Sequence, residues 1–247
     1  MRLPEEFHPA LTARHPGQSM LTLCMLLIGS EAWAETIHSR YDVRVIGVKV
    51  GEMAMASSET HNRYSTRARF ATTGAVSTIS NASFDISTKG RITGRGYVPQ
   101  SYREVTNEGR HSTNVKISYS SGIATKVTGD TGGRVAPVDP SKMRDALDPL
   151  TTLYLALRAQ PASKACSLNT DVYDGQRHAR LTLTEQEYTA GGVRCAGFYR
   201  RIAGYSSSSK KNTRVPVSVT YSTQGDMLYA QLVTVDTRYG KVTLHRR

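Results

Sequence analysis

Alternation of apolar and polar residues, interrupted by glycine at short intervals, constrains this chain more than any other feature. Residues 36–126 are rich in Val, Ile, Thr, Ser, Tyr and Arg, and good helix formers rarely occur there in runs. β-Branched and aromatic residues favour extended backbone, whereas Gly, Asn and Asp favour the turns between strands. The same pattern returns after residue 167. The sequence therefore predicts a mainly β protein whose strands are joined by short turns.

Individual strands can be placed from this pattern. Tyr41–Val50 reads as the first strand, and Gly51 allows it to continue with a bend. A second region, residues 80–98, reads as two strands that turn at Lys89-Gly90. The other expected strands cover residues 63–70, 102–106, 115–120, 123–128, 167–173, 179–188, 193–202, 215–221, 227–237 and 241–245.

The strand at residues 63–70 places charge on one face. Its apolar and polar residues alternate, as expected of an antiparallel strand that is buried on one side. Five arginines on this strand and the next follow the same period of two and could form a cationic rim around a ligand: Arg63, Arg67, Arg69, Arg91 and Arg95.

Only residues 148–159 read persuasively as a helix. Asp148 suits the N-cap, Pro149 suits the first helical position, and Pro161 ends the element. The apolar residues that recur at helical spacing are Leu150, Leu153, Tyr154 and Leu157. This spacing predicts one apolar stripe that packs on the sheet.

Roughly a dozen strands and one helix predict a single domain over residues 35–247. We expect a long antiparallel meander that is curled around, or packed on, the amphipathic helix, because open sheets of this size curl or split. A curled sheet has one concave face and one convex face.

The N-terminal segment predicts export. Residues 21–28 are a short apolar run, and Ala32-Trp33-Ala34 follows it. This order is typical of a secretory signal peptide cleaved after Ala34. We therefore expect residues 1–34 to be a leader and the mature protein to be periplasmic in a bacterium and not membrane-spanning. An uncleaved anchor, and a start at Met20 in place of Met1, stay open.

Cleavage would leave two cysteines, Cys166 and Cys195. In an oxidising compartment such a pair predicts a disulfide, and closing a loop of about 30 residues would stabilise the fold by roughly 3 kcal/mol. A metal site that includes His178 is the alternative, but its spacing matches no zinc pattern. We expect no metal and no cofactor.

The chain is basic, with a formal net charge of +12. Removal of the leader takes away two basic and three acidic residues, so the charge becomes +13. Nucleic acid is not expected as a partner, because the protein is expected to be exported and has no recognition helix or RNA-binding signature. An anionic lipid or another anionic envelope polymer is the expected partner, and plain solubility is the other explanation of the charge.

No catalytic motif is visible. The sequence has no G-x-S-x-G elbow, phosphate loop or dinucleotide fingerprint, and its histidines are scattered. Asp171, Asp174 and His178 could be combined into a site, but Asp174 is better explained by a turn whose backbone it holds. Asp148 is better explained as a helix cap than as a base. We therefore expect no enzyme.

These observations leave two functional hypotheses and a remote third. The first is a non-catalytic carrier whose concave face holds an apolar or anionic amphiphilic ligand, with the five arginines at its rim. The second is a structural or interaction protein of the cell envelope that uses an edge strand or the basic face. A hydrolase is the remote third. The oligomeric state is not predicted.

Several segments resemble one family. They are Tyr41–Glu52, Asp148–Thr151, Tyr173–Gly175, Cys195–Gly204 and Tyr239–Lys241. Together they resemble exported proteobacterial proteins grouped as domain of unknown function 3108, over nearly the whole mature chain. The family is similar in style to curled-sheet carriers of lipids and lipoproteins in the periplasm, which is a likeness of fold alone. It has no established reaction, so the resemblance implies no catalytic residues.

Overall fold

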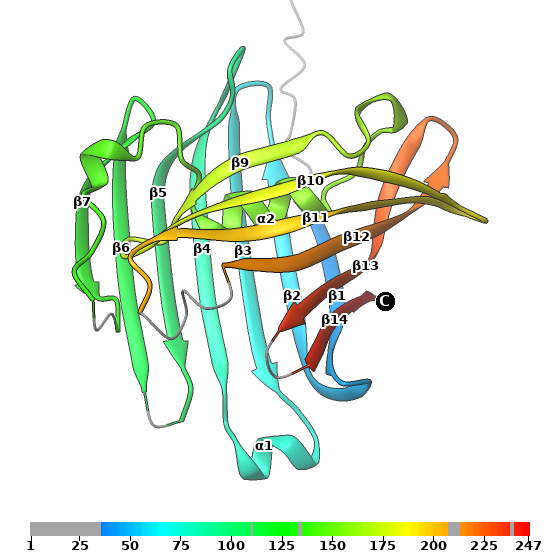
Figure 1. Cartoon of the computed structure of the whole chain (residues 1–247), viewed down its shortest axis with the longest axis horizontal. Helices are drawn as coiled ribbons and strands as arrows, with labels where there is room; N and C mark the ends of the chain where they lie inside the picture. The colour runs from blue at the N-terminus through cyan, green and yellow to red at the C-terminus, as the bar shows by residue number, and fades with distance from the viewer. Residues whose placement is uncertain (1–35, 110, 133–134, 207–212, 238–239) are drawn as a thin grey trace, which may run out of the picture. The chain divides into compact units, whose positions relative to one another are not determined.

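The computed structural model describes residues 36–109, 111–132, 135–206, 213–237 and 240–247 (Figure 1). The predicted leader, which contains Cys24 and Trp33, lies outside the described residues. Within the described part of the chain, β-strands dominate and two short α-helices occur, so the predicted fold class is confirmed as mainly β.

Fourteen strands of the described residues form one antiparallel sheet. Its order is β7-β6-β5-β4-β3-β2-β1-β14-β13-β12-β11-β10-β9, and the two-residue β8 also pairs with β13. The strands are β1 Thr36–Val45, β2 Val48–Glu59, β3 Arg63–Thr72, β4 Ser83–Thr93, β5 Gly96–Asn107, β6 Ser112–Ser120, β7 Ile123–Asp130, β8 Gln160–Pro161, β9 Leu168–Tyr173, β10 His178–Thr189, β11 Gly192–Ala203, β12 Arg214–Gln224, β13 Met227–Thr237 and β14 Gly240–Arg246. The helices are α1 Ala75–Ile79 and α2 Pro149–Leu157, with 3₁₀ turns at Pro140–Lys142 and Ala162–Lys164.

The sheet consists of two meanders that are joined where the first and last strands meet. β1 pairs with β14, so that Tyr41 lies opposite Arg246 and Val43 opposite Leu244. In Figure 1 the strands β9–β13 cross over the strands of the first meander, and α2 is seen between the two sets. The helix contacts β3, β4 and β5 of the first meander and β9 and β13 of the second.

The two ends of the sheet approach each other without closing it. β7 and β9 are the last strands at either end of the order, and no ladder joins them in the described residues. The turn after β9 nevertheless packs on the inner side chains of β6 and β7. A Cβ atom placed on Gly175 would lie 3.0 Å from Val115 and 3.2 Å from Val127. The sheet is therefore strongly curled but open.

One apolar core fills the inside of this curl. Large side chains that are less than 2% exposed come from both meanders and from the helix between them: Tyr41, Tyr102, Ile117, Leu150, Tyr173, Leu183 and Leu228. All seven belong to a single cluster of buried or closely packed residues. Residues 36–247 therefore bury one continuous core.

The predicted first strand over residues 41–50 is wrong. A tight turn at Ile46-Gly47 divides it into β1 and β2, which pair with each other. Both turn residues have positive φ angles, 50° for Ile46 and 82° for Gly47. β-Branched residues rarely adopt this conformation, so Ile46-Gly47 does not carry an ordinary turn signal.

The predicted turn at Lys89-Gly90 is also wrong. Residues 83–93 form one strand, β4, and the turn lies at residues 94–95. Gly90 instead lets neighbouring groups pack closely against β4. A Cβ atom there would overlap the carbonyl oxygen of Val98 and lie 2.6 Å from the ring of Tyr64. A glycine inside a strand marks this kind of close approach as often as a turn.

The helix α2 is two residues shorter at its C-terminal end than the predicted segment, and it is not the only helix. Asp148 caps it, and Pro149 takes the first helical position, as expected. Of the four predicted stripe residues, Leu150, Tyr154 and Leu157 are buried, whereas Leu153 is half-buried. α1 was not predicted from the sequence.

Candidate functional site

An apolar groove lies on the inner face of the sheet, where the ends of β1–β5 meet α2 and β14. It has a volume of about 430 Å³. Its apolar lining consists of Val43, Met53, Phe70, Phe84, Leu153 and Leu244, with Ala82 at the margin. Met53 is buried, but the other five large side chains are only partly covered. The groove is thus a stretch of the core surface that the protein leaves open.

Strand register brings the lining of this groove together. Phe70 lies opposite Met53 across β2–β3 and opposite Phe84 across β3–β4. The rings of Phe70 and Phe84 stack with their centroids 5.4 Å apart. Gly51 makes room for them, because a Cβ atom at this position would lie 2.6 Å from the ring of Phe70. The missing side chain at Gly51 and the two stacked rings therefore shape the same wall of the groove.

Leu244 and Val43 complete the wall from the opposite ends of the chain, since they are partners across β1–β14. Leu153 enters from α2. Sequence reasoning placed Phe70 and Leu153 on apolar faces, but it had no signal for the β1–β14 pairing that brings Val43 and Leu244 to them.

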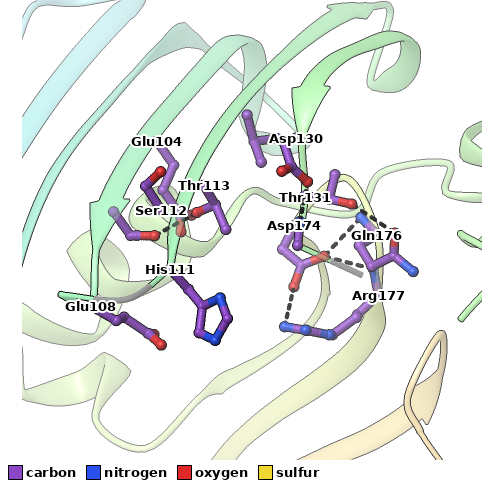
Figure 2. A pocket seen from close by; sticks show the side chains of 13 residues that line it. Glu104, Glu108, His111, Ser112, Thr113, Asp130, Thr131, Asp174, Gln176 and Arg177 are labelled. Atoms are coloured by element: carbon purple, nitrogen blue, oxygen red, sulfur yellow. Dashed lines mark hydrogen bonds and ion pairs between the residues drawn. The ribbon is translucent and has the colours of Figure 1, made fainter. Parts of the chain in front are cut away.

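A polar pocket adjoins the groove (Figure 2). It has a volume of about 360 Å³ and shares Thr106 and Glu108 with the groove. Figure 2 shows Glu104, Glu108 and His111 on one side of the pocket and Asp174 and Arg177, from the turn after β9, on the other, with Asp130 close to Asp174.

Two partly buried carboxylates of this pocket accept hydrogen bonds from the protein itself. Asp174 accepts hydrogen bonds from the backbone N–H groups of Gln176 at 2.9 Å and Arg177 at 2.6 Å. This confirms the turn-holding role expected of Asp174. Glu104 accepts a hydrogen bond from the hydroxyl of Tyr102. Burial raises the pKa of both carboxyl groups above the ordinary value.

This pocket does not form a catalytic constellation in the described residues. No side-chain hydrogen bond joins His111 to a serine or a carboxylate there. No group of His, Cys, Asp and Glu among the described residues could hold a metal ion. Asp171 and His178 do meet, with 2.9 Å between the carboxylate and Nε2, but Arg180 also binds Asp171 and Asp174 lies apart from this pair in its own turn.

The predicted arginine rim lies on the other face of the sheet. Arg63, Arg67 and Arg69 are exposed on β3, where they alternate with buried residues that point to the core. Arg91 lies beside Arg63 on β4, and Arg95 lies in the turn after β4. Strand alternation sends the four arginines of β3 and β4 outward, and Arg95 lies in the turn, so none of the five lines the inner groove. The spacing of the arginines in the sequence indicated that they share one face of the sheet, but not whether that face is the inner or the outer one.

The predicted disulfide is confirmed. Cys166 and Cys195 are bonded, with 5.0 Å between their Cα atoms. The bond joins the segment before β9 to β11. Both sulfur atoms are used, so the alternative metal site with His178 does not form.

The described residues contain no helix that is long and apolar enough to span a membrane.

Comparison with known proteins gives a family and a distant structural likeness. The chain is similar to a solved structure titled "Crystal Structure of Beta-barrel-like Protein of Domain of Unknown Function DUF1849 from Brucella abortus". The two chains are 10% identical with a TM-score of 0.37, and the match covers 85% of this chain and 94% of that chain. No curated protein matches the chain.

A family model described as "Protein of unknown function (DUF3108)" matches residues 40–189, which is more than half of the chain. The resembling segments Cys195–Gly204 and Tyr239–Lys241 lie beyond the matched range. The match includes the strands and the helix that line the inner groove, apart from β14. The chain belongs to the DUF3108 family, whose function is unknown.

Proposed function

We propose that this protein is a non-catalytic carrier, exported to the bacterial periplasm, that holds the apolar part of a lipid-like ligand in the inner groove. The observation that carries the proposal is the apolar lining of a groove of about 430 Å³, whose large side chains are left partly uncovered. Sites for small ligands have this size and this chemistry, and each uncovered apolar side chain gains free energy when a ligand covers it.

The curl of the sheet around α2 supports this proposal. Leu150, Tyr154 and Leu157 of the helix are buried, but Leu153 stays half-buried at the groove. An apolar chain that extends the core at this point would be covered by the sheet on one side and by α2 on the other. The polar pocket beyond Thr106 and Glu108 offers room for the polar end of an amphiphile.

Selection for an anionic head group by the five arginines is not part of the proposal for this groove. Those side chains project from the outer face, and the charged side chain that lines the groove itself is Glu108. We therefore propose that the apolar part of the ligand provides recognition here.

An interaction protein of the cell envelope is the second candidate. The observation that favours it is the exposed end of the sheet at β7, which forms a ladder only with β6 in the described residues. Most residues of this strand are exposed. The 3₁₀ turn Pro140–Lys142 also contacts β7. An edge strand without a second ladder partner can pair with a strand of another protein.

The experiment compares two variants of α2. Leu153→Asn places an amide at the groove, whereas Leu155→Asn changes a partly exposed leucine of the same helix that does not line the groove. Binding of dansyl-undecanoic acid is followed by fluorescence, and lipids that co-purify with the natively isolated protein are identified by mass spectrometry. Loss of most of one buried leucine is worth about 1.5–3 kcal/mol, so binding should weaken at least tenfold in Leu153→Asn.

The control Leu155→Asn should bind the probe as the wild type does. Protein from the periplasmic fraction whose intact mass matches a chain beginning at Glu35 would support export. A wild-type protein that binds no probe and carries no lipid would refute the carrier and leave the interaction protein.

A further inference from the structure

A second hollow lies on the outer face of the sheet, across β2–β5 and away from the inner groove. It has a volume of about 450 Å³. The side chains that matter there are Ser58, Arg63, Ser65, Lys89, Arg91 and Gln100. No aspartate or glutamate lines it, although carboxylates line both the inner groove and the polar pocket.

Three cations of this hollow are brought together by strand register. Arg63 lies directly opposite Arg91 across β3–β4, and Lys89 lies opposite Ser65 in the same pair of strands. Like charges that face each other on one side of a sheet destabilise it. Among the described residues, none of the three cations forms an ion pair.

The same face also holds an arginine pair that a carboxylate partly compensates. Farther along β3, Arg67 and Arg69 both bind Asp85 of β4, and Nε of Arg67 lies 2.9 Å from its carboxylate. Asp85 therefore compensates one end of the arginine row. The other end, at Arg63 and Arg91, has no such carboxylate.

The acidic residue nearest in sequence to this end is turned away from it. Glu59 ends β2, but its carboxylate accepts hydrogen bonds from Tyr97 and, at 2.7 Å, from Tyr154. Tyr154 belongs to α2 inside the curl. The carboxylate of Glu59 is thus engaged on the opposite face.

A β-bulge adds a neutral hydrogen-bonding group. Lys89 pairs with Ser101 and Gly90 pairs with Pro99, which leaves Gln100 as the extra residue of β5. Its exposed side chain lines the hollow. Bulges redirect side chains in this way and are common beside binding sites. Ser58 and Ser65, which lie opposite each other across β2–β3, supply hydroxyl groups beside it.

We propose that this outer hollow is a binding site for a phosphate group. The guanidinium groups of Arg63 and Arg91 and the ammonium group of Lys89 supply the charge, and Ser58, Ser65 and Gln100 supply neutral donors. A phosphate has several acceptor oxygens, and a guanidinium group can bind two of them at once. Its negative charge would also remove the repulsion between Arg63 and Arg91. The phosphate can come from a lipid head group or from a small soluble phosphate.

This site is separate from the inner groove, so it stands or falls independently of the carrier function. The test compares Arg63→Gln/Arg91→Gln with Arg67→Gln/Arg69→Gln. Both double variants remove the same charge from the same face, but the second removes arginines whose charge Asp85 already compensates in part. Circular dichroism checks that both variants fold.

Inorganic phosphate is titrated by calorimetry, and vesicles of phosphatidylglycerol in phosphatidylcholine are tested by co-sedimentation. We expect Arg63→Gln/Arg91→Gln to weaken binding at least tenfold and Arg67→Gln/Arg69→Gln to weaken it less than threefold. Binding of inorganic phosphate that is lost in this way supports a soluble phosphate as the source, and the same loss with vesicles alone supports a lipid head group. Equal weakening in both variants, or no binding of either probe by the wild type, would overturn the proposal.

Discussion

Replacing Asp148 by alanine should destabilise the fold strongly, because this carboxylate holds the start of α2 to the sheet from a fully buried position. It is 0% exposed. Its carboxylate accepts hydrogen bonds from the backbone N–H of Thr151 at 2.8 Å, from the hydroxyl of Thr151 at 2.6 Å and from the hydroxyl of Thr88 at 2.8 Å. Tyr64 continues this network, with 2.9 Å between its hydroxyl and that of Thr151.

The size of the effect follows from these three bonds. Loss of an N-cap side chain costs about 1 kcal/mol. Each buried hydroxyl that loses its acceptor costs roughly another 1 kcal/mol or more, although the Thr88 and Thr151 hydroxyls, 3.1 Å apart, can partly satisfy each other. Removal of the buried carboxylate offsets part of this loss. We expect Asp148→Ala to lower the free energy of unfolding by about 2–4 kcal/mol, a large share of the roughly 5–15 kcal/mol typical of a domain.

Asp148→Asn is the matched control, since it keeps an acceptor for the Thr151 N–H and removes the charge. Burial raises the pKa of Asp148 in the folded protein. The stability contributed by this raised pKa is present below the unfolded-state pKa and is lost as the pH rises through the folded-state pKa. The wild type should therefore gain stability relative to Asp148→Asn as the pH falls from neutral toward 4.

Urea unfolding followed by circular dichroism at pH 7 and at pH 4.5 measures both effects. If Asp148→Ala unfolds within 0.5 kcal/mol of the wild type, on the order of an ordinary surface substitution, the buried network does not hold the helix and the reasoning fails.

Two further predictions concern the second meander. Cys166→Ser/Cys195→Ser should lower the free energy of unfolding by about 3 kcal/mol, and the wild type in reductant should show the same lowered urea midpoint as this double variant. A double variant with the urea midpoint of the oxidised wild type would contradict the loop-closure argument. Gly197→Ala should lose about 2–3 kcal/mol, because its Cβ atom would overlap the carbonyl oxygen of Thr182 across β10–β11. Gly191→Ala, which meets nothing within 4 Å, is its control, and equal losses in the two variants would show that the clash is relieved without consequence.

Local patterns predicted most of the strands and the start of α2. The alternation of buried Val115, Ile117 and Tyr119 with exposed residues matches β6, and Ser121-Gly122 forms the expected turn. These features depend on neighbours in the sequence. Asp148 as a cap has the same local origin.

The predictions that were wrong concern positions whose conformation depends on contacts between residues distant in the sequence. Gly90 looked like a turn, but it is needed where Tyr64 and Val98 press on the strand. Ile46 forms a turn despite an unsuitable side chain. The side chains of the inner groove are typical core residues, and only the tertiary arrangement leaves them uncovered at one place.

The pairing of β1 with β14 also decides when the inner groove is complete. Synthesis proceeds from the N-terminus, so each meander can form from neighbouring hairpins. One edge of β1 stays unpaired until β14, about 200 residues later in the sequence, is present. Leu244, on that last strand, is also a wall of the groove. A chain that is interrupted after β13 could form most of its hairpins and still lack the wall that completes the groove. In the proposed carrier, the groove would therefore depend on β14 as well as on the strands of the first meander.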